Sequence, residues 1–422
     1  MQERVVHSEA GHSTALLRNI AYATGESRPH LDTGRTDCLK PVVGCSTTRG
    51  IVVSGDGSTD DRSQLADFVR CSYLGLDNHP VIVGKAIEAQ RSLHSSTART
   101  RLNFDLLGDL EAALSELFWA RVVVFSSGML ANLGAMSILA SGQLTGGTKP
   151  VVVFDSFAHI SLACHKPLVA DETRVETIAH NDMDALERLC SENAVVAYVC
   201  DGVYSTGGHS PLKALCQLQE RYGLFLYIDD AHGITIVGRQ GEGFARSHFS
   251  TILGERTIIA ASLTKGFGAS GGMLMLGTTE QEALFRRCCI PYMFSAPPTL
   301  AAIGAALGSC KIHHSTELGE RQRRLAQRIK VFDRRVATAE QGNSLPIRRI
   351  VIGSEANALA VARGLLDRGF YTQMTLFPKL GQETAGIRVR ITVEHEVSDI
   401  ERLCNSILET VDEITEKPYP LR

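Results

Sequence analysis

Short apolar runs alternate with amphipathic segments between about residue 121 and residue 277. The runs are four or five residues long and apolar at nearly every position, and they cover residues 121–125, 151–154, 195–199, 224–228 and 257–261. Continuous runs of this kind predict strands that are buried on both faces of a sheet. The segments between them, such as 183–189 and 212–220, have the apolar spacing of helices. We therefore predict an α/β domain with a mainly parallel sheet.

The pattern changes after about residue 300. Residues 300–311 and 317–338 predict long helices, and 348–352, 357–368 and 387–393 predict a βαβ-like unit before a final helix over 397–411. A chain of 422 residues is long enough for one large and one smaller domain. We expect a polar extension over 1–50, an entry segment over 51–75 that packs with the small domain, a large domain over 76–298 and a small domain over 299–422.

Polar side chains follow each of the five predicted strands. Ligands of parallel sheets bind at the carboxyl ends of the strands, so the residues found there are candidates for a site. Polar residues end most strands, and one or two such endings would be chance. Here all five runs end in this way, and the residues concerned include Ser127, Asp155, Asp201, Asp229 and Lys265. The repetition indicates a functional site at this edge.

These residues meet the chemical requirements of a site for pyridoxal 5′-phosphate (PLP). Lys265, which precedes a Gly-rich loop, supplies an amine for a Schiff base with the aldehyde, and Asp229 supplies a carboxylate that keeps the pyridine nitrogen protonated. Backbone N–H groups at Gly128 and Met129, where a helix is predicted to begin, and the hydroxyl of Ser262 suit the phosphate. Taken alone, Lys265 also fits an ordinary lysine beside a flexible loop.

Two histidines and a serine complete the candidate site. His159 could stack on the pyridine ring, and His232 and Ser205 are candidates for contact with the ring oxygen. A single histidine at a strand end is more often a structural residue. That alternative weakens here because the spacing of both histidines from the preceding aspartates repeats a known pattern.

That pattern belongs to a family. The stretches Tyr-Ile-Asp-Asp-Ala-His-Gly at 227–233 and Ser-Leu-Thr-Lys-Gly-Phe-Gly at 262–268 closely resemble the α-oxoamine synthases. Tyr-Leu-Gly-Leu at 73–76, Ser-Gly-Met-Leu-Ala-Asn at 127–132, Asp-Gly-Val-Tyr-Ser at 201–205 and Arg-Val-Arg-Ile-Thr at 388–392 follow in the family's order. The resemblance implies the PLP-dependent transferase fold of type I, with a mainly parallel sheet of the seven-stranded type in a large domain and a smaller α+β C-terminal domain.

The resemblance also implies a role for each matching residue. Arg390 would hold the carboxylate of an amino acid, which the planar fork of a guanidinium suits. Without the resemblance, Arg388 and Arg390 would be read as one solvated face of a strand. The other implied roles are the Schiff-base lysine for Lys265, the pyridinium partner for Asp229, the stacked ring for His159, contact with the ring hydroxyl for His232 and Ser205, and phosphate binding for Gly128, Met129 and Ser262.

The reaction that the resemblance implies is the decarboxylative condensation of a small α-amino acid with an acyl thioester, carried on CoA or a carrier protein, to give an α-amino ketone. It further implies a homodimer in which the neighbouring chain completes each site. An aminotransferase, lyase or decarboxylase on the same fold needs the same lysine and aspartate and stays open as an alternative. A non-catalytic subunit is a second alternative, although such subunits commonly lose the lysine that this chain keeps.

The chain departs from the family pattern near the expected entrance of the site. Between His94 and Glu111, Leu107 stands where a histidine is usual, and Ser, Thr and Arg replace most glycines. Ser72 stands where an asparagine usually precedes the Tyr-Leu-Gly-Leu motif. Because this segment helps to shape the pocket for the second substrate in relatives, the sequence does not predict the acyl partner.

Composition argues against several other classes. A net charge of −3 offers no basic surface for nucleic acid or anionic lipid, and no apolar stretch reaches the roughly 18 residues of a membrane span. The eleven cysteines include no Cys-x-x-Cys pair, so we expect no metal site and reduced thiols in the cytoplasm. The G-x-G-x-x-G pattern at 266–271 leads into a predicted strand, whereas a dinucleotide fingerprint leads into a helix.

Overall fold

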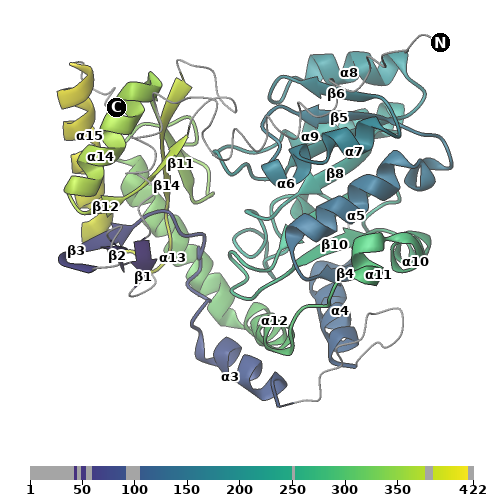
Figure 1. The fold of residues 1–422 in the computed structure, drawn as a ribbon, viewed down its shortest axis with the longest axis horizontal. Coiled ribbons are helices and arrows are strands. Elements are labelled where there is room, and N and C mark those ends of the chain that lie inside the picture. Colours follow the sequence, from purple (N-terminus) through teal and green to yellow (C-terminus); the bar gives the residue numbers. More distant parts are fainter. Residues whose placement is uncertain are drawn as a thin grey trace, which may run out of the picture.

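The computed structural model describes residues 42–44, 49–53, 59–91, 105–249, 252–375 and 384–416. A seven-stranded sheet with the order β4-β10-β9-β8-β7-β5-β6 lies at the centre of the larger of two lobes (Figure 1). Its strands are β4 (Arg121–Phe125), β5 (Val151–Asp155), β6 (Val175–Ile178), β7 (Val196–Asp201), β8 (Phe225–Asp229), β9 (Thr257–Ser262) and β10 (Gly272–Leu276). The five strands predicted from apolar runs all form, and the stretch after the glycine pattern is a strand, as expected.

The strands β6, β5, β7, β8 and β9 run parallel, and β10 runs antiparallel to both β9 and β4. This mixed, mainly parallel sheet is the one expected for fold type I. Parallel strands end at one edge, and the register places Asp201 opposite Asp229 and Asp229 opposite Ala260. The sheet thereby brings together side chains that lie far apart in the sequence.

Apolar side chains leave the sheet on both faces, which explains why the strands are apolar at every position. Along β8, Leu226 and Ile228 enter one core cluster while Phe225 and Tyr227 enter the other. The first face is covered by α4 (Asp105–Phe118), α8 (Met183–Glu192), α9 (Leu212–Tyr222) and α12 (Leu300–His313). The second face is covered by α5 (Gly128–Ala140), α7 (Lys166–Ala170), α10 (Thr279–Cys288) and α11 (Ile290–Phe294).

The second lobe is built on a three-stranded antiparallel sheet of β11 (Ile347–Gly353), β14 (Ala385–Arg390) and β13 (Gln373–Thr375). Three helices share its apolar cluster, namely α13 (Thr316–Asp333), α14 (Glu355–Asp367) and α15 (Val397–Thr415). The predicted βαβ-like arrangement is wrong in one respect, because β11 and β14 pair antiparallel. The helix predicted over 317–338 ends at Asp333, whose carboxylate binds the fully buried guanidinium of Arg348 at 2.7 Å.

Residues near the start of the described chain join the second lobe. β1 (Val42–Gly44), β2 (Arg49–Val53), β3 (Thr59–Asp67) and β12 (Phe370–Tyr371) form one sheet, in which β3 and β12 run parallel. Phe68 and Tyr73 are then buried in the same apolar cluster as α13 and β14. The next helix, α3 (Pro80–Ala89), packs on α12 close to Gly304, where a Cβ atom would lie 2.3 Å from a carbonyl oxygen of α3.

Most of the predicted extension over 1–50 lies outside the described residues. The domain bounds expected at residues 75 and 298 stay a prediction. Among the helices that the structure describes, none is long and apolar enough to cross a membrane.

Candidate active site

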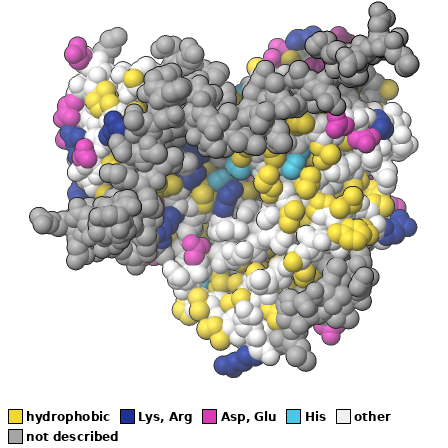
Figure 2. All heavy atoms as spheres, in the orientation of Figure 1, with side chains coloured by type: hydrophobic (Ala, Val, Ile, Leu, Met, Phe, Trp, Pro, Cys, Tyr) yellow, Lys and Arg dark blue, Asp and Glu magenta, His cyan; other side chains and the backbone are white. Residues whose placement is uncertain are grey.

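A cavity of about 260 Å³ lies at the carboxyl ends of β7, β8 and β9. Figure 2 shows histidine side chains and Lys or Arg side chains together in the depression between the two lobes. Of the residues to which the sequence analysis gave a role with the cofactor or the substrate, all except Ser205 and Arg390 line this cavity. They are Gly128, Met129, His159, Asp229, His232, Ser262 and Lys265.

Lys265 reaches the cavity from the loop that follows β9. The backbone N–H of Gly268 donates to the carbonyl of Lys265 at 3.1 Å, and a positive φ of 71° at Gly268 lets the loop turn against Leu76. The amine Nζ of Lys265 lies 3.0 Å from Nε2 of His232. Burial lowers the pKa of Lys265, while the nearby Asp229 carboxylate opposes this effect. A lowered pKa increases the share of the neutral amine, which is the form that attacks an aldehyde.

His232 links this lysine to the entry segment. Its Nδ1 lies 2.7 Å from the hydroxyl of Tyr73, which is fully buried. Burial, together with the positive charge of Lys265, lowers the pKa of His232 well below its ordinary value, so the imidazole is neutral. Burial raises the pKa of Tyr73, so its hydroxyl keeps its proton. Sequence reasoning used Tyr73 only as part of a motif and missed this contact.

Asp229 ends β8 with both carboxylate oxygens engaged. The N–H of Ala231 donates to Oδ1 at 3.1 Å, and the side-chain amide of Asn132 donates to Oδ2 at 3.0 Å. Asn132 is the last residue of the Ser-Gly-Met-Leu-Ala-Asn motif, and the sequence alone predicted no role for it. It comes from α5, so the helix that begins at the cavity also orients the carboxylate.

The neighbouring Asp230 points away from the cavity into the protein. It is fully buried and accepts a hydrogen bond from the N–H of Ala245 at 2.9 Å, and burial raises its pKa well above the ordinary value. A Cβ atom at Gly202 or Gly233 would lie within 2.5 Å of its carboxyl oxygen. The two consecutive aspartates therefore have different tasks, since the second one holds together the loops beneath the site.

The start of α5 supplies donors at one end of the cavity. The hydroxyl of Ser127 caps the helix by accepting from the N–H of Leu130 at 3.3 Å, while Gly128 and Met129 line the cavity. The N–H groups of a first turn have no acceptor within their helix, which makes them suited to a phosphate. Ser262 adds a hydroxyl to the same lining. The donor set, with Asp229, His232 and Lys265 beside it, fits PLP.

His159 lies between β5 and α6 (Ile160–Ala163), and three contacts fix its position. Its backbone N–H donates to Oδ1 of Asp201 at 3.0 Å. Its ring nitrogen Nδ1 lies 3.2 Å from the backbone N–H of Ser161 and 2.8 Å from the Ser161 hydroxyl. The imidazole is thus held against the cavity, and its predicted stacking on the cofactor ring stays a prediction.

Arg388 and Arg390 are both buried, so the reading of a solvated strand face is wrong. Arg388 donates to the carbonyl of Ser205 and to Oε1 of Gln373, and Arg390 donates to the carbonyl of Val69. Among the described residues, the Nε atoms of both arginines have no hydrogen-bond partner. Burial and the adjacent Arg390 lower the pKa of Arg388 to about 9. Ser205 therefore contacts Arg388 and does not line the cavity.

The atypical segment is described only in part. His94 lies outside the described residues, whereas Leu107 and Glu111 lie on α4. Leu107 is fully buried in the core against the sheet. Glu111 accepts from the N–H of Val124 at 2.9 Å and forms an ion pair with Arg286 at 2.8 Å. Leucine at position 107 thus extends the core and brings no polar group to the cavity.

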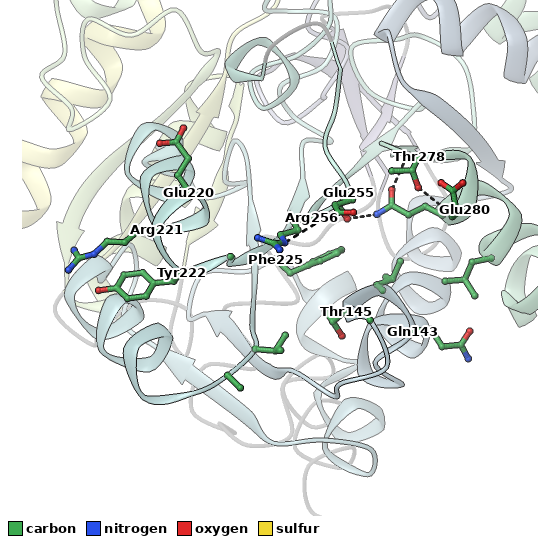
Figure 3. Close-up of a pocket in the computed structure, with 17 residues that line it drawn as sticks. Gln143, Thr145, Glu220, Arg221, Tyr222, Phe225, Glu255, Arg256, Thr278 and Glu280 are labelled. Carbon is green, nitrogen blue, oxygen red and sulfur yellow. Dashed lines mark hydrogen bonds and ion pairs between the residues drawn. The ribbon is translucent and has the colours of Figure 1, made fainter.

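A larger cavity of about 670 Å³ lies at the opposite edge, where β7, β8 and β9 begin. Figure 3 shows its labelled side chains spread around an open hollow, with Glu220 and Arg221 on one side and Thr278 and Glu280 on the other. Among the residues that the structure describes, no lysine or histidine lines this cavity. The larger cavity therefore lacks the amine that the expected chemistry needs, and the smaller cavity, which Lys265 lines, is the better candidate for the active site. In the described part of the chain, no cluster of His, Cys, Asp or Glu could hold a metal ion.

Comparison with known proteins shows the family to which the chain belongs. The model of the aminotransferase class I and II family matches residues 67–407. An 8-amino-7-oxononanoate synthase of Maricaulis maris is 31% identical over 376 residues, which are 86% of this chain and 90% of the relative. A Geobacter sulfurreducens protein of the same name is 30% identical over 92% of this chain and 96% of its own length.

Solved structures share the fold. Serine palmitoyltransferase from S. paucimobilis, with a bound PLP–myriocin aldimine, has a TM-score of 0.78 at 22% identity and covers 95% of this chain and 100% of its own. The 8-amino-7-oxononanoate synthase of Francisella tularensis has a TM-score of 0.67 at 19% identity over 83% of this chain and 98% of its own. At these identities the likeness shows the fold.

Proposed function

The chain belongs to the aminotransferase class I and II family and, within it, to the α-oxoamine synthases, and on this premise we propose that the cavity beside Lys265 is its active site. The protein is a PLP-dependent acyltransferase that condenses an α-amino acid with an acyl thioester and releases CO₂. The observation that carries the proposal is the contact between Lys265 Nζ and His232 Nε2 at 3.0 Å, in the cavity that Asp229 also lines.

Each residue around the cavity would bind a different part of the cofactor. Bound PLP supplies a reactive aldehyde and an electron-withdrawing ring. Lys265 would hold the aldehyde carbon, Asp229 would hold the ring nitrogen, and His159 would cover the ring face. Gly128, Met129 and Ser262 would bind the phosphate, and His232 and Ser205 would contact the ring hydroxyl. The position of Ser205 away from the cavity lining makes His232 the better supported of that pair.

The chemical steps use the same side chains. The buried guanidinium of Arg390, beside Arg388, would bind the carboxylate of the amino acid. Lys265, whose pKa is lowered by burial, would take the α-proton on Nζ. The α-carbon would then attack the thioester carbonyl, the sulfur would leave as a thiolate, the former carboxylate would depart as CO₂, and Lys265 Nζ would return a proton to the α-carbon. We propose a small α-amino acid and an acyl group on CoA or a carrier protein as substrates.

We also infer that the protein is a homodimer. Large apolar side chains are exposed beside the cavity at Met129 and Ile160, on α5 and α6, and at Ile290 and Phe294 on α11, which packs on α5. These helices contact one another, so the exposed side chains belong to one region of the large lobe. Exposed apolar patches of this kind mark interfaces between proteins. We further place the protein in the cytoplasm, because the nine described cysteines are all free thiols.

Replacing Asp229 tests the proposed site. We expect Asp229→Ala to lower turnover by roughly 10²- to 10⁴-fold, the scale of losing one catalytic group, and to retain part of the bound PLP. Thiol release would be measured with glycine, alanine and serine against a panel of acyl thioesters. The exposed Asp171→Ala serves as the matched control.

Two results would contradict the proposal. Near-normal turnover of Asp229→Ala would remove this carboxylate from the mechanism. Turnover that needs a 2-oxo acid and releases no thiol would show aminotransfer at this site.

A further inference from the structure

One side chain connects the group that would hold the nitrogen of the cofactor ring and the group that would cover the face of that ring. Asn132 is completely buried in α5, and its amide nitrogen donates to Asp229 Oδ2 at 3.0 Å and to the Ser161 hydroxyl at 3.0 Å. Its amide oxygen accepts from the hydroxyl of Tyr227 at 2.7 Å. An amide has two N–H hydrogens and one acceptor oxygen, so every polar function of Asn132 is used.

The direction of these hydrogen bonds is fixed. The carboxylate of Asp229 can only accept, so the amide nitrogen of Asn132 must face it, and the amide oxygen is left to accept from the hydroxyl of Tyr227. The nitrogen of the amide then faces Asp229 and Ser161. Since the Ser161 oxygen accepts from Asn132, its own hydrogen is directed to Nδ1 of His159 at 2.8 Å.

The same nitrogen of His159 receives a second donor, the backbone N–H of Ser161 at 3.2 Å. A ring nitrogen that accepts hydrogen bonds carries no proton, and a neutral imidazole must then carry its proton on the other nitrogen, Nε2. The hydroxyl and the backbone N–H of Ser161 both donate to Nδ1 of His159, so both favour the form without a proton on that nitrogen. The contacts therefore select one tautomer of His159.

We propose that Asn132 is a positioning residue that holds the Asp229 carboxylate in one orientation and, through Ser161, keeps the proton of His159 on Nε2. One buried amide thus positions both the partner of the ring nitrogen and the imidazole that covers the ring before any ligand binds. This inference rests on the proposed function, because it takes Asp229 as the partner of the ring nitrogen and His159 as the group that covers the ring. Its chemistry suits a site that must bind PLP and present an N–H donor from the covering imidazole.

The first test reads the tautomer directly. In cofactor-free protein with ¹⁵N-labelled histidine, His159→Gln identifies the resonances of His159, and we expect the wild type to show the Nε2–H form. Asn132→Leu and Ser161→Ala should each produce a measurable share of the Nδ1–H form. Ser137→Ala, which removes a hydroxyl of the same helix that donates to the carbonyl of Leu133, should change nothing.

The second test measures the affinity for PLP by titration of the cofactor-free protein. We expect Asn132→Leu to weaken binding by about 10- to 100-fold, the scale of a lost hydrogen bond to a charged group. Ser161→Ala should change it by no more than about 3-fold, because the contact between Asn132 and Asp229 remains. Ser161 is only half-buried, so this variant remains informative if Asn132→Leu does not fold.

The outcomes separate this inference from the function on which it rests. A wild type that binds no PLP would overturn the proposed site, whereas the tautomer would still be readable without cofactor. Wild-type PLP binding with His159 protonated on Nδ1 would overturn the role of the network. Unchanged tautomer and affinity in folded Asn132→Leu would overturn it as well.

Discussion

Lys265 and His232 lie within hydrogen-bond distance of each other, and His232 is buried while Lys265 is half-buried. Burial lowers the pKa of each, because removing water disfavours the charged forms of both side chains. Asp229 opposes the effect at Lys265. The lysine is thereby a better nucleophile than a surface lysine, while the neutral His232 adds no positive charge beside it.

Lys265 itself provides a prediction that needs no substrate. After incubation with PLP and reduction with borohydride, we expect the intact mass of the wild-type chain to increase by one reduced cofactor. Lys265→Ala should show no increase, and its turnover should fall by at least about 100-fold because the α-proton loses its base. Lys311→Ala is the matched control, since this exposed lysine of α12 lies outside the cavity lining. Equal labelling of Lys265→Ala would place the covalent bond elsewhere.

At the scale of elements, the large lobe was predictable because its strands are buried on both faces and therefore apolar throughout. β6 was missed because only Ile178 of its four residues is buried at this edge of the sheet, and the strand gives no apolar run. Helix α13 was predicted five residues too long. Its own sequence does not show that Asp333, where the helix ends, forms an ion pair with the buried Arg348 of β11.

The site was predictable to a similar degree. Side chains at strand ends were found because the carboxyl edge of a parallel sheet collects them. The contacts of Tyr73, Asn132 and Ser161 were missed because they join separate elements. No local pattern encodes a distance between residues that the fold brings together. The burial of Arg388 and Arg390 was missed for the same reason, because β14 lies against Ser205 and Val69 from other parts of the chain.

Helix α12 carries a buried histidine that should make stability depend on pH. Nδ1 of His313 lies 2.8 Å from the Ser309 carbonyl, and burial lowers its pKa to about 4. The unfolded histidine has an ordinary pKa of about 6.5, so between these values the unfolded chain binds a proton that the folded chain does not. The stability contribution is complete above pH ~6.5 and is lost as the pH falls toward about 4, by up to roughly 3 kcal/mol.

Urea unfolding of the wild type and of His313→Gln at pH 7.5 and pH 5 would measure this effect. We expect the free energy of unfolding of His313→Gln to change less between the two pH values than that of the wild type. The exposed His248→Gln should behave like the wild type. If the free energy of unfolding of His313→Gln changed between the two pH values as much as that of the wild type, other groups would cause the acid sensitivity.

At the scale of the whole molecule, the exposed apolar side chains beside the cavity predict the state of assembly. Phe294→Glu in α11, where the side chain is 67% exposed, should convert a dimer into monomers without unfolding the chain. Sedimentation velocity would measure the change. Ile252→Glu is the control, because this side chain is also exposed, at 74%, but lies outside the three helices. A dimer that persists in Phe294→Glu, or a wild-type monomer, would contradict the inferred interface.

The parallel pairing of β3 with β12 joins residues of the first seventy to residues near 370. A ribosome releases the partners of this pairing at widely separated times, so β3 leaves the exit tunnel long before its neighbour exists. The large sheet, whose strands all lie between residues 121 and 276, has its full sequence outside the tunnel first. Tyr73 takes its buried place beside His232 only when the second lobe closes over it. During synthesis, completion of the proposed active site therefore waits until the strands and helices of the second lobe have been made.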